Sequence, residues 1–408
     1  MPSRGSANPG AGEVDALDDV LSAEGWVYAS ALPVDGSDPG RFHALFGRDS
    51  LITALQVLPA RPDVAAATLR ALAALQGRRV DATWDEEPGK IVHEVRPSIS
   101  FERQGYLGLT PPEGDLRYYG SADGTGWFLH VLRATGDAAL AAELEPAWRA
   151  AGAWLLAAIE AGGGFVRWGP RAGPGGLAQQ GWRDTVDPRD VAYHGGGILR
   201  EDCSAPEPPV ADADTQAVAV VALRALAALS GEPAHAAAAA TLERRVREAF
   251  TPETMALERD DRAVPGAGSQ LGWLLWAGCA PAGAAERLAQ PDVLTGFGLR
   301  TLSDRHPCFD AHAYHRGSIW PFDSWLGWGG LRAAGLDEGA ERVRTGVLAA
   351  LDRLGRFPEL YAVTDAGPEP VAIANRVQAW TVGARWALEH EWDGRAGHER
   401  VGGPRPLR

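Results

Sequence analysis

The sequence predicts an all-α protein whose helical hairpins close into a ring. Apolar residues recur at three- and four-residue steps in segment after segment, whereas strand-like alternation is nearly absent. Short links between paired helices alternate with long loops. With 408 residues, 45% of them hydrophobic and 23% charged, the chain is long enough to bury a large core.

The two ends of the chain are expected to lie outside this core. Residues 2–12 are small and polar with Gly and Pro, so we predict a disordered tail over residues 1–12. A flexible C-terminal tail is expected over residues 396–408. Residues 13–395 are then predicted to form one domain.

Helix boundaries follow from periodicity and capping residues. Leu140, Leu144, Trp148 and Ile159 fall on one helical face behind Asp137, a residue type favoured at helix N-caps. The same reasoning places helices over residues 14–22, 49–58, 62–76, 122–135, 137–161, 211–230, 232–250, 269–279, 282–290, 319–334, 337–354 and 375–390.

The links between helices indicate how the helices are arranged. Links of two or three residues make neighbouring helices antiparallel, and the long loops 78–121 and 162–210 then lie at one end of the assembly. Residues 162–169 and 255–264 could each hold a short strand, but they predict no sheet. Because no repeat is visible in the sequence, a closed ring is favoured over a regular solenoid.

Charge and cysteine usage restrict the partners and the compartment. A net charge of -14 and a pI near 5.2 argue against a nucleic-acid partner, which needs a basic face, and favour a neutral substrate. We find no secretory signal or membrane span, so a cytoplasmic protein without a membrane partner is expected. Cys203, Cys279 and Cys308 show no C-x-x-C spacing, so neither a zinc site nor a disulfide is predicted.

The sequence has 15 tryptophans, and several of them are predicted to lie in loops beside acids and hydrogen-bond donors. Trp84, Trp168, Trp182 and Trp320 belong to this group, whereas the tryptophans on apolar helical faces are assigned to the core. An aromatic ring suits the C–H face of a sugar, with hydrogen bonds to the hydroxyls at its edge. A carbohydrate is therefore the expected partner.

Loop carboxylates are the second signal. They are Asp49, Glu94, Asp184, Asp187, Asp323 and Glu359. Glycoside hydrolysis needs one carboxyl group to donate a proton and another to act on the opposite face of the sugar. Asp184 beside Trp182 is the candidate acid, because partial desolvation raises a carboxyl pKa, and Glu359 is the candidate base. The mechanism needs no metal or other cofactor, and His312 and His315 are interpreted as structural or sugar-contacting.

Nine segments, taken in order, resemble a known family. They are FGRDSLITAL, ATLRALAALQG, DEEPGKIVHEVR, RYYGSAD, QQGWRDTVD, FGLRTLS, YHRGSIWPFDS, FPELYA and RVQAWTVGA. Together they resemble the bacterial amylo-α-1,6-glucosidases of the glycogen-debranching, C-terminal type, over about residues 40 to 388.

The resemblance implies a fold, an activity and roles for individual residues. The fold is a six-hairpin (α/α)6 barrel with long loops at one rim, and the activity is that of an inverting glucosidase. Asp184 matches the general acid and Glu359 the general base, which in inverting enzymes lie roughly 6.5–9.5 Å apart. Arg48 and Asp49 match the pair that holds the hydroxyls of the non-reducing sugar. The other pocket positions are Glu94, Arg96, Trp182, Asp187, His315 and Trp320.

Departures from the family pattern leave the substrate open. The sequence has no room for the usual N-terminal β-rich domain, E-V-Q-G-Y appears as DTQAV over residues 214–218, and WPHD appears as WPFD. A glycogen or limit-dextrin branch and a small α-glucoside both fit, as do a trehalose-, glucosylglycerate- or mannosylglycerate-like glycoside. A non-catalytic sugar-binding barrel is a further alternative. The segment VADADT, residues 210–215, suggests one more alternative, an α/α-barrel terpene cyclase. The oligomeric state is not predicted.

Overall fold

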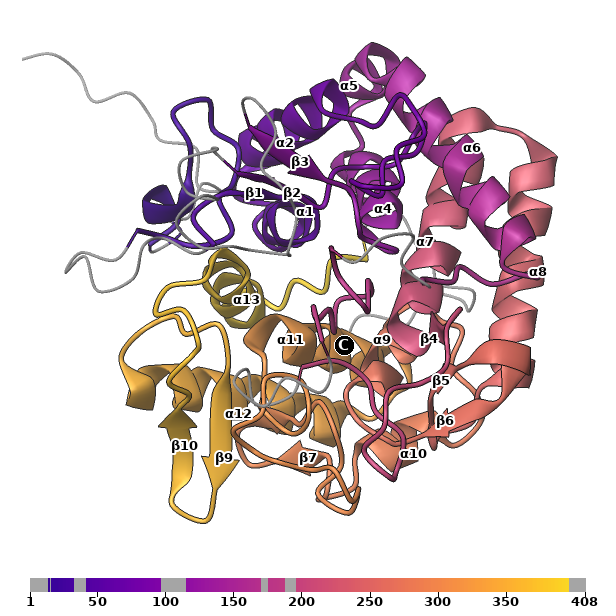
Figure 1. The fold of residues 1–408 in the computed structure, drawn as a ribbon. Coiled ribbons are helices and arrows are strands. Elements are labelled where there is room, and N and C mark those ends of the chain that lie inside the picture. The colour runs from indigo at the N-terminus through magenta and orange to yellow at the C-terminus, as the bar shows by residue number, and fades with distance from the viewer. Residues whose placement is uncertain are drawn as a thin grey trace, which may run out of the picture.

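A computed structural model describes residues 14, 16–32, 42–96, 115–169, 175–187 and 196–395. The expected tails, residues 1–12 and 396–408, lie outside the described residues. The described chain is rich in helices, and short strands connect some of them (Figure 1).

Six inner helices form a closed circuit of contacts. Each packs against the next in chain order, and the last packs against the first, so that they surround the middle of the molecule (Figure 1). The inner helices are α1 (Gly47–Gln56), α4 (Gly124–Thr135), α7 (Ala213–Ser230), α9 (Gln270–Trp276), α11 (Pro321–Ala333) and α13 (Ala379–Glu389). This is the arrangement expected of an α/α toroid.

Outer helices pack against all six inner ones; α13 has only part of the outer helix α12 beside it. They are α2 (Pro62–Ala74), α5 (Ala138–Glu143), α6 (Glu145–Ala161), α8 (Pro233–Ala249), α10 (Ala284–Leu288) and α12 (Asp337–Leu354). Within the described residues no helix follows α13. The helix predicted over residues 14–22 is only a 3-10 turn, η1 (Asp18–Val20).

Local sequence explains where the helices begin and end. The carboxylate of Asp137 accepts hydrogen bonds from the backbone N–H groups of Ala139 and Leu140, which starts α5. The single helix predicted over residues 137–161 is wrong, because the chain breaks at Leu144 and restarts with Pro146 in the first turn of α6. Gly136 ends α4 with φ of 63°, a left-handed conformation that glycine adopts without strain.

The prediction that no sheet forms is also wrong, because the described residues contain four small antiparallel sheets. Their strands have only two to four residues, too few to show alternation in the sequence. The sheets comprise β1 (Leu45–Phe46), β2 (Glu94–Arg96) and β3 (Leu116–Tyr118); β4 (Ala211–Asp212), β5 (Thr254–Leu257) and β6 (Ala263–Pro265); β7 (Leu294–Thr295) and β8 (Gly298–Leu299); and β9 (Tyr361–Thr364) and β10 (Gly367–Pro370). Strands β1 and β4 run directly into inner helices α1 and α7.

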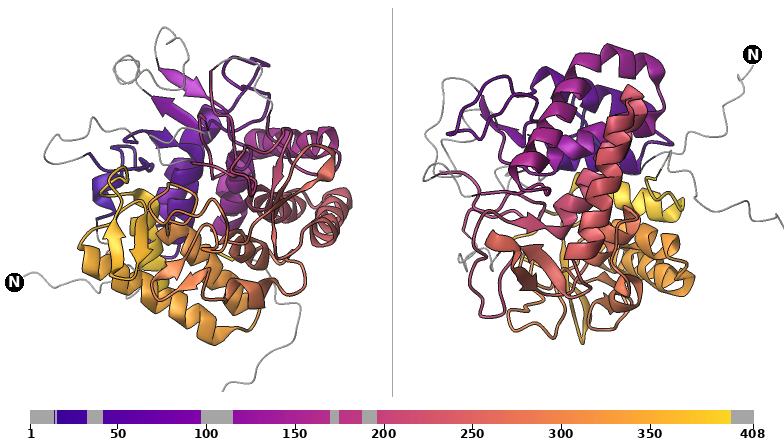
Figure 2. Two further views of the ribbon diagram at one scale, coloured as in Figure 1. Left: turned by 60° about the horizontal axis from the view of Figure 1, so that its bottom comes forward. Right: turned by 90° about the vertical axis from the view of Figure 1, so that its right-hand side faces the viewer.

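The strands and long loops gather at one end of the helical ring, as the right-hand view of Figure 2 shows. The inner helices begin at this end: Arg48 of α1 pairs with Asp123, which precedes α4, and Asp49 accepts a hydrogen bond from Gln378, which precedes α13. We call this end the N-terminal rim. Residues that are distant in sequence meet there.

Helix α7 is the one described helix that is long and apolar enough to cross a membrane. Within the structure 72% of it is buried. Its place in the inner circuit accounts for this composition, because an inner helix of a ring is covered on several faces.

The structure contains a disulfide that the cysteine spacing did not predict. Cys203 and Cys308 are joined with their Cα atoms 5.7 Å apart, although 105 positions separate them in sequence. Cys279 is free and buried. Disulfides persist in oxidising compartments, so cysteine usage does not favour the expected cytoplasmic location, which stays a prediction.

Candidate active site

Arg48 and Asp49 begin helix α1 at the N-terminal rim, and both side chains are buried. Nε of Arg48 lies 2.8 Å from the Asp123 carboxylate, Nη1 donates to Oδ2 of Asp184 at 2.9 Å, and Nη2 donates to the Gly181 carbonyl at 2.9 Å. Burial alone would lower the pKa of Arg48, but Asp123 and Asp184 outweigh it and raise that pKa. Arg48 thus stays charged and directs its donors at protein groups.

Asp184 lies in a tight turn. Gln179 and Thr185 bond to each other through their backbones and close the turn, which leaves residues 180–184 between them. A quarter of the Asp184 side chain is exposed. Burial raises the pKa of Asp184 to about 6 against the opposing effect of Arg48. This carboxyl group can therefore carry a proton near neutral pH.

His93 is a further neighbour of Asp184 that the sequence analysis did not select. Its Nε2 lies 3.9 Å from Oδ2 of Asp184, and its ring is buried. Burial, followed by the charges of Arg48 and Arg96, holds the pKa of His93 well below its usual value, so the imidazole is neutral. The only sequence signal was its position directly before Glu94.

Glu359 is buried and reaches Asp49 through two intermediates. The backbone N–H of Asn375 donates to Oε2 of Glu359 at 3.1 Å, and the Asn375 side chain donates to Gln378 at 2.8 Å. Gln378 donates in turn to Oδ1 of Asp49 at 3.1 Å. The hydroxyl of Tyr314 donates to Oε1 of Glu359. Glu359 is therefore held by contacts from two other segments.

Asp49 interacts electrostatically with both candidate carboxyl groups. Burial raises its pKa to about 8, Arg48 opposes the rise, and the charges of Asp184 and Glu359 add to it. Asp184 and Glu359, far apart in sequence, thus come to the same helix start, one through Arg48 and the other through the Gln378 relay.

Glu94 and Arg96 lie on strand β2, next to β1, and form a buried ion pair with each other. The Arg96 guanidinium lies 5.2 Å from the ring centre of Phe46. The charge of Glu94 acts to raise the pKa of Asp184, which places this pair close to the candidate acid. Asp187 is partly exposed and ends the described segment 175–187.

Trp182, His315 and Trp320 belong to one buried aromatic cluster. Trp182 stacks on Trp273 with ring centres 5.8 Å apart and planes at 8°, and its ring centre lies 5.3 Å from that of His315. Nδ1 of His315 accepts a hydrogen bond from the backbone N–H of Gly197 at 3.0 Å. Tyr314, which contacts Glu359, packs against His315 and Trp320. The cluster therefore packs against the residue that bonds Glu359.

The other loop tryptophans lie elsewhere. Trp168 is buried, and its indole N–H donates to Asp212 at 2.6 Å. Trp84 is half-buried in a separate small cluster with Leu116, Tyr118 and Leu177. Neither is joined to Asp184 or Glu359 by a described contact.

The acids of VADADT, Asp212 and Asp214, contact other residues of the fold. Asp212 caps α7 by accepting from Thr215, and Asp214 forms an ion pair with Arg183. Both acids thus have structural contacts, which argues against the terpene-cyclase alternative. Within the described ranges, no group of three or more His, Cys, Asp or Glu side chains is placed to hold a metal ion.

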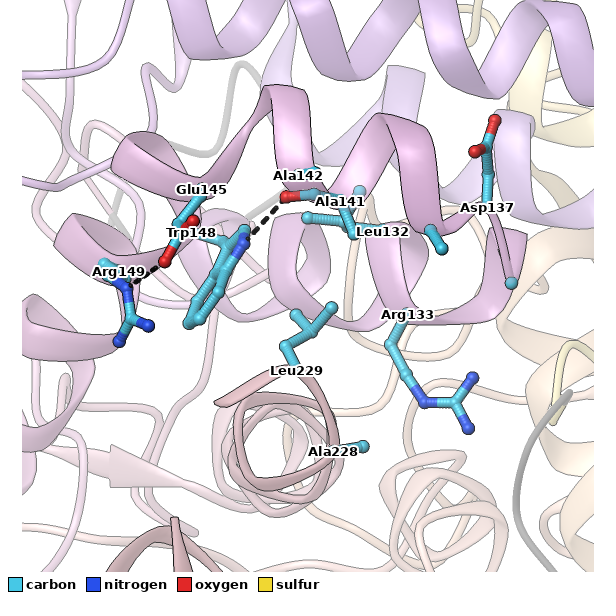
Figure 3. A pocket seen from close by; sticks show the side chains of 12 residues that line it. Leu132, Arg133, Asp137, Ala141, Ala142, Glu145, Trp148, Arg149, Ala228 and Leu229 are labelled. Carbon is cyan, nitrogen blue, oxygen red and sulfur yellow. Dashed lines mark hydrogen bonds and ion pairs between the residues drawn. The ribbon is translucent and has the colours of Figure 1, made fainter. Parts of the chain in front are cut away.

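Two cavities lie away from the aromatic cluster. One, of about 410 Å³, lies between the C-terminal end of α4 and helices α5, α6 and α7, with Trp148 and Arg149 in its wall (Figure 3). The other, of about 610 Å³, is lined by Lys90, Trp154, Trp168 and Gln180, among others. Neither contains Asp184 or Glu359.

A helical toroid with carboxyl groups gathered at one rim is an arrangement suited to glycoside hydrolysis. Over residues 120–370 the sequence matches the family described as the mannosylglycerate hydrolase MGH1-like glycoside hydrolase domain. The chain belongs to this family and is a glycoside hydrolase. The specific resemblance to amylo-α-1,6-glucosidases is not confirmed.

Solved structures share the fold. The GH63 mannosylglycerate hydrolase from Thermus thermophilus in complex with glucose is 17% identical, with a TM-score of 0.65 over 93% of this chain and 98% of that chain. The complex of that enzyme with Tris and D-glycerate is 16% identical, with a TM-score of 0.65 over 93% of this chain and 99% of that chain. A structure described as a wild-type glycosidase is 17% identical, with a TM-score of 0.53 over 93% of this chain and 94% of that chain. Comparison with curated protein sequences gave no match.

Proposed function

We propose that this protein is an inverting hydrolase of a small α-glycoside whose aglycone is a hydroxy acid, as in mannosylglycerate or glucosylglycerate. The family match and the D-glycerate complex of a structural neighbour support this substrate class over a glycogen branch. The observation that carries the proposal is that Asp184 and Glu359 are both linked to the start of α1, Asp184 through Arg48 and Glu359 through Asn375 and Gln378.

In the proposed mechanism Asp184 is the acid. It donates its proton to the glycosidic oxygen as the bond from the anomeric carbon to that oxygen breaks. Arg48 fixes Oδ2 at 2.9 Å, and no described group bonds to Oδ1, so Oδ1 is the oxygen that presents the proton. The pKa of about 6 keeps part of the acid protonated near neutral pH.

Glu359 is the proposed base. It removes a proton from a water molecule whose oxygen attacks the anomeric carbon from the opposite face, which inverts the anomeric configuration. Tyr314 and the Asn375 backbone fix the carboxylate. Asp49, Glu94, Arg96, Asp187 and the Trp182, His315 and Trp320 cluster are proposed to shape the sugar pocket around it.

We also propose that residues 13–395 form a single (α/α)6 barrel. Support comes from the closed circuit of six inner helices and from the fold shared with the structural neighbours. In this proposal the N-terminal rim holds the substrate site.

The test is a substrate panel. Purified protein is incubated with 2-O-α-D-mannosylglycerate, 2-O-α-D-glucosylglycerate, trehalose, isomaltose and a glycogen limit dextrin, and the released sugar and its first-formed anomer are followed by NMR. The expected result is release of the β-anomer from one of the two glycerates. Exclusive cleavage of the limit dextrin would favour the debranching activity instead, and no release from any member would overturn the proposal.

A further inference from the structure

Arg183 lies between the aromatic residue Trp182 and the proposed acid Asp184 in sequence, yet its side chain bonds to other residues than the acid. Only 1% of that side chain is exposed. It forms an ion pair with Asp214 in the first turn of α7 and donates to the hydroxyl of Ser269, the residue before α9, at 2.9 Å. One side chain therefore fastens the acid-bearing turn to two inner helices.

The same side chain also fixes the aromatic cluster. The Arg183 guanidinium lies 4.6 Å from the ring centre of Trp182, which stacks on Trp273. The indole N–H of Trp273 donates to Asp323 in the first turn of α11 at 2.5 Å. Through these contacts the turn is also connected to a third inner helix, α11.

A buried arginine of this kind is costly unless its charge and donors are matched. Taking a guanidinium out of water carries a large desolvation penalty, which an adjacent carboxylate and good hydrogen bonds offset. Arg48 already holds the turn through Asp184 and the Gly181 carbonyl. Arg183 adds a second anchor, through Asp214 and Ser269, so two buried arginines hold the turn by different contacts.

We infer that Arg183 is a positioning residue that sets the reach of the Asp184 carboxyl toward the glycosidic oxygen. This inference rests on the proposed function, since it assigns to Arg183 an effect on proton donation alone. The base takes its direct hydrogen bonds from Tyr314 and Asn375 rather than from Arg183. Loss of Arg183 should therefore impair the departure of the aglycone and leave water activation intact.

The leaving group separates these two effects. An alkoxide aglycone needs a proton as its bond to the anomeric carbon breaks, whereas fluoride leaves as a stable anion without one. An enzyme with a misplaced acid should lose activity on the glycerate and keep it on the glycosyl fluoride. A loosened or partly unfolded protein should lose both activities together.

The experiment compares the wild type, Arg183→Lys and Asp214→Asn on two matched pairs of substrates. These are 2-O-α-D-mannosylglycerate with α-D-mannosyl fluoride, and 2-O-α-D-glucosylglycerate with α-D-glucosyl fluoride. Lysine keeps the charge but not the planar fork of donors. Asparagine keeps the volume of Asp214 and removes its charge. If one variant does not fold, the other reports on the same contact.

Arg224→Met is the matched control. Arg224 also pairs with an acid, Glu243, and donates to the Ala277 carbonyl, but it lies in the second half of α7, away from the N-terminal rim. Melting temperatures of all variants show the structural cost of each change. The control should lose stability without a change in the ratio of the two activities.

We expect Arg183→Lys to lower kcat on the glycerate about 100-fold, the size of effect typical of a small misplacement of a catalytic group. Its kcat on the matching fluoride should stay within about threefold of wild type, and KM for the glycerate should change little. An equal loss on both substrates, or no loss on either, would overturn the role of Arg183. If the wild type acts on none of the four compounds, the proposed function itself fails.

Discussion

The guanidinium of Arg48 lies 2.9 Å from Oδ2 of Asp184 and 2.8 Å from the carboxylate of Asp123. One buried cation thus pairs with two carboxylates, Asp123, which is buried, and Asp184, which is a quarter exposed. The enclosed partner keeps the arginine in place. The exposed partner is the group that we propose to donate a proton, and its ionisation depends on that arginine.

Replacing Asp184 with Asn should remove the proton donor without changing the shape of the turn. General acid catalysis typically contributes about 10²–10⁴-fold, so kcat on the glycerate substrate should fall by that factor. In the wild type the active form is protonated, and the Asp184 pKa is raised to about 6. The kcat/KM of the wild type should therefore fall tenfold per pH unit above about pH 6. A flat profile between pH 6 and 9 would rule Asp184 out as the acid.

Replacing Glu359 with Ala should remove the base and open space beside the anomeric carbon. Hydrolysis should then fall by about 10²–10⁴-fold. Azide is a nucleophile that needs no base, so added azide should restore turnover of the α-glycosyl fluoride and give the β-glycosyl azide. The product is identified by NMR, and chloride at the same concentration is the control. Rescue that yields the α-azide would contradict an inverting role for Glu359.

Replacing Arg48 with Met should affect both stability and the pH profile. Asp123 would be left buried without its cation, which typically costs about 3–5 kcal/mol in the free energy of unfolding. Arg48 lowers the pKa of Asp184, so its loss should move the alkaline limb of kcat/KM above pH 6. Urea unfolding and pH-dependent kinetics measure the two effects. Arg61→Met, which breaks an exposed pair with Asp63, should cost at most about 1 kcal/mol and leave the limb unchanged.

The Asp49 carboxyl should make the protein less stable as the pH rises. Burial raises its folded-state pKa to about 8 from an ordinary value of 3.8, so folding favours the protonated form. Its contribution to stability is complete below about pH 4 and is lost as the pH rises toward 8, by up to about 1.4 kcal/mol per unit. In Asp49→Asn this part of the pH dependence should disappear. Unfolding free energies of both proteins at pH 5, 6, 7 and 8 decide the question; parallel curves would refute it.

Breaking the Cys203–Cys308 disulfide should destabilise the protein by roughly 2–5 kcal/mol, because the bridge closes a loop of about 100 residues. The double variant Cys203→Ser, Cys308→Ser should melt at a lower temperature than the wild type. Thiol titration of the unfolded protein should find one free thiol before reduction, from Cys279, and three after it. Three thiols before reduction would show that the bridge does not form.

Helix positions were the most predictable part of the fold. Apolar periodicity and capping residues such as Asp137 are local signals, and apart from residues 14–22 the helices lie within a few residues of the predicted ranges. The break at Leu144 was missed because the apolar stripe continues through it. The small sheets were missed because strands of two to four residues carry no visible alternation. Their pairing depends on contacts between segments that are far apart in sequence, such as Phe46 with Glu94.

For the candidate site, the sequence identified acids and aromatic residues but not their partners. Asp184 and Glu359 could be selected because carboxylates beside loop aromatics suit sugar chemistry. Asp123 and Gln378 could not, since each matters only through a contact across the ring. Arg48 was expected to bind sugar, and that role stays a prediction; its described donors point to Asp123, Asp184 and Gly181. The bridge between Cys203 and Cys308 was invisible for the same reason.

The shared starting point of the inner helices has an electrostatic consequence. Each helix N-terminus carries a partial positive charge of roughly half a unit, because its first backbone N–H groups point outward unpaired. Asp49, Asp214 and Asp323 lie in the first turns of three of these helices. The converging helix dipoles offset part of the repulsion among the crowded acids. A single rim can thus hold one carboxyl group ionised and another protonated, although the chain as a whole is strongly negative.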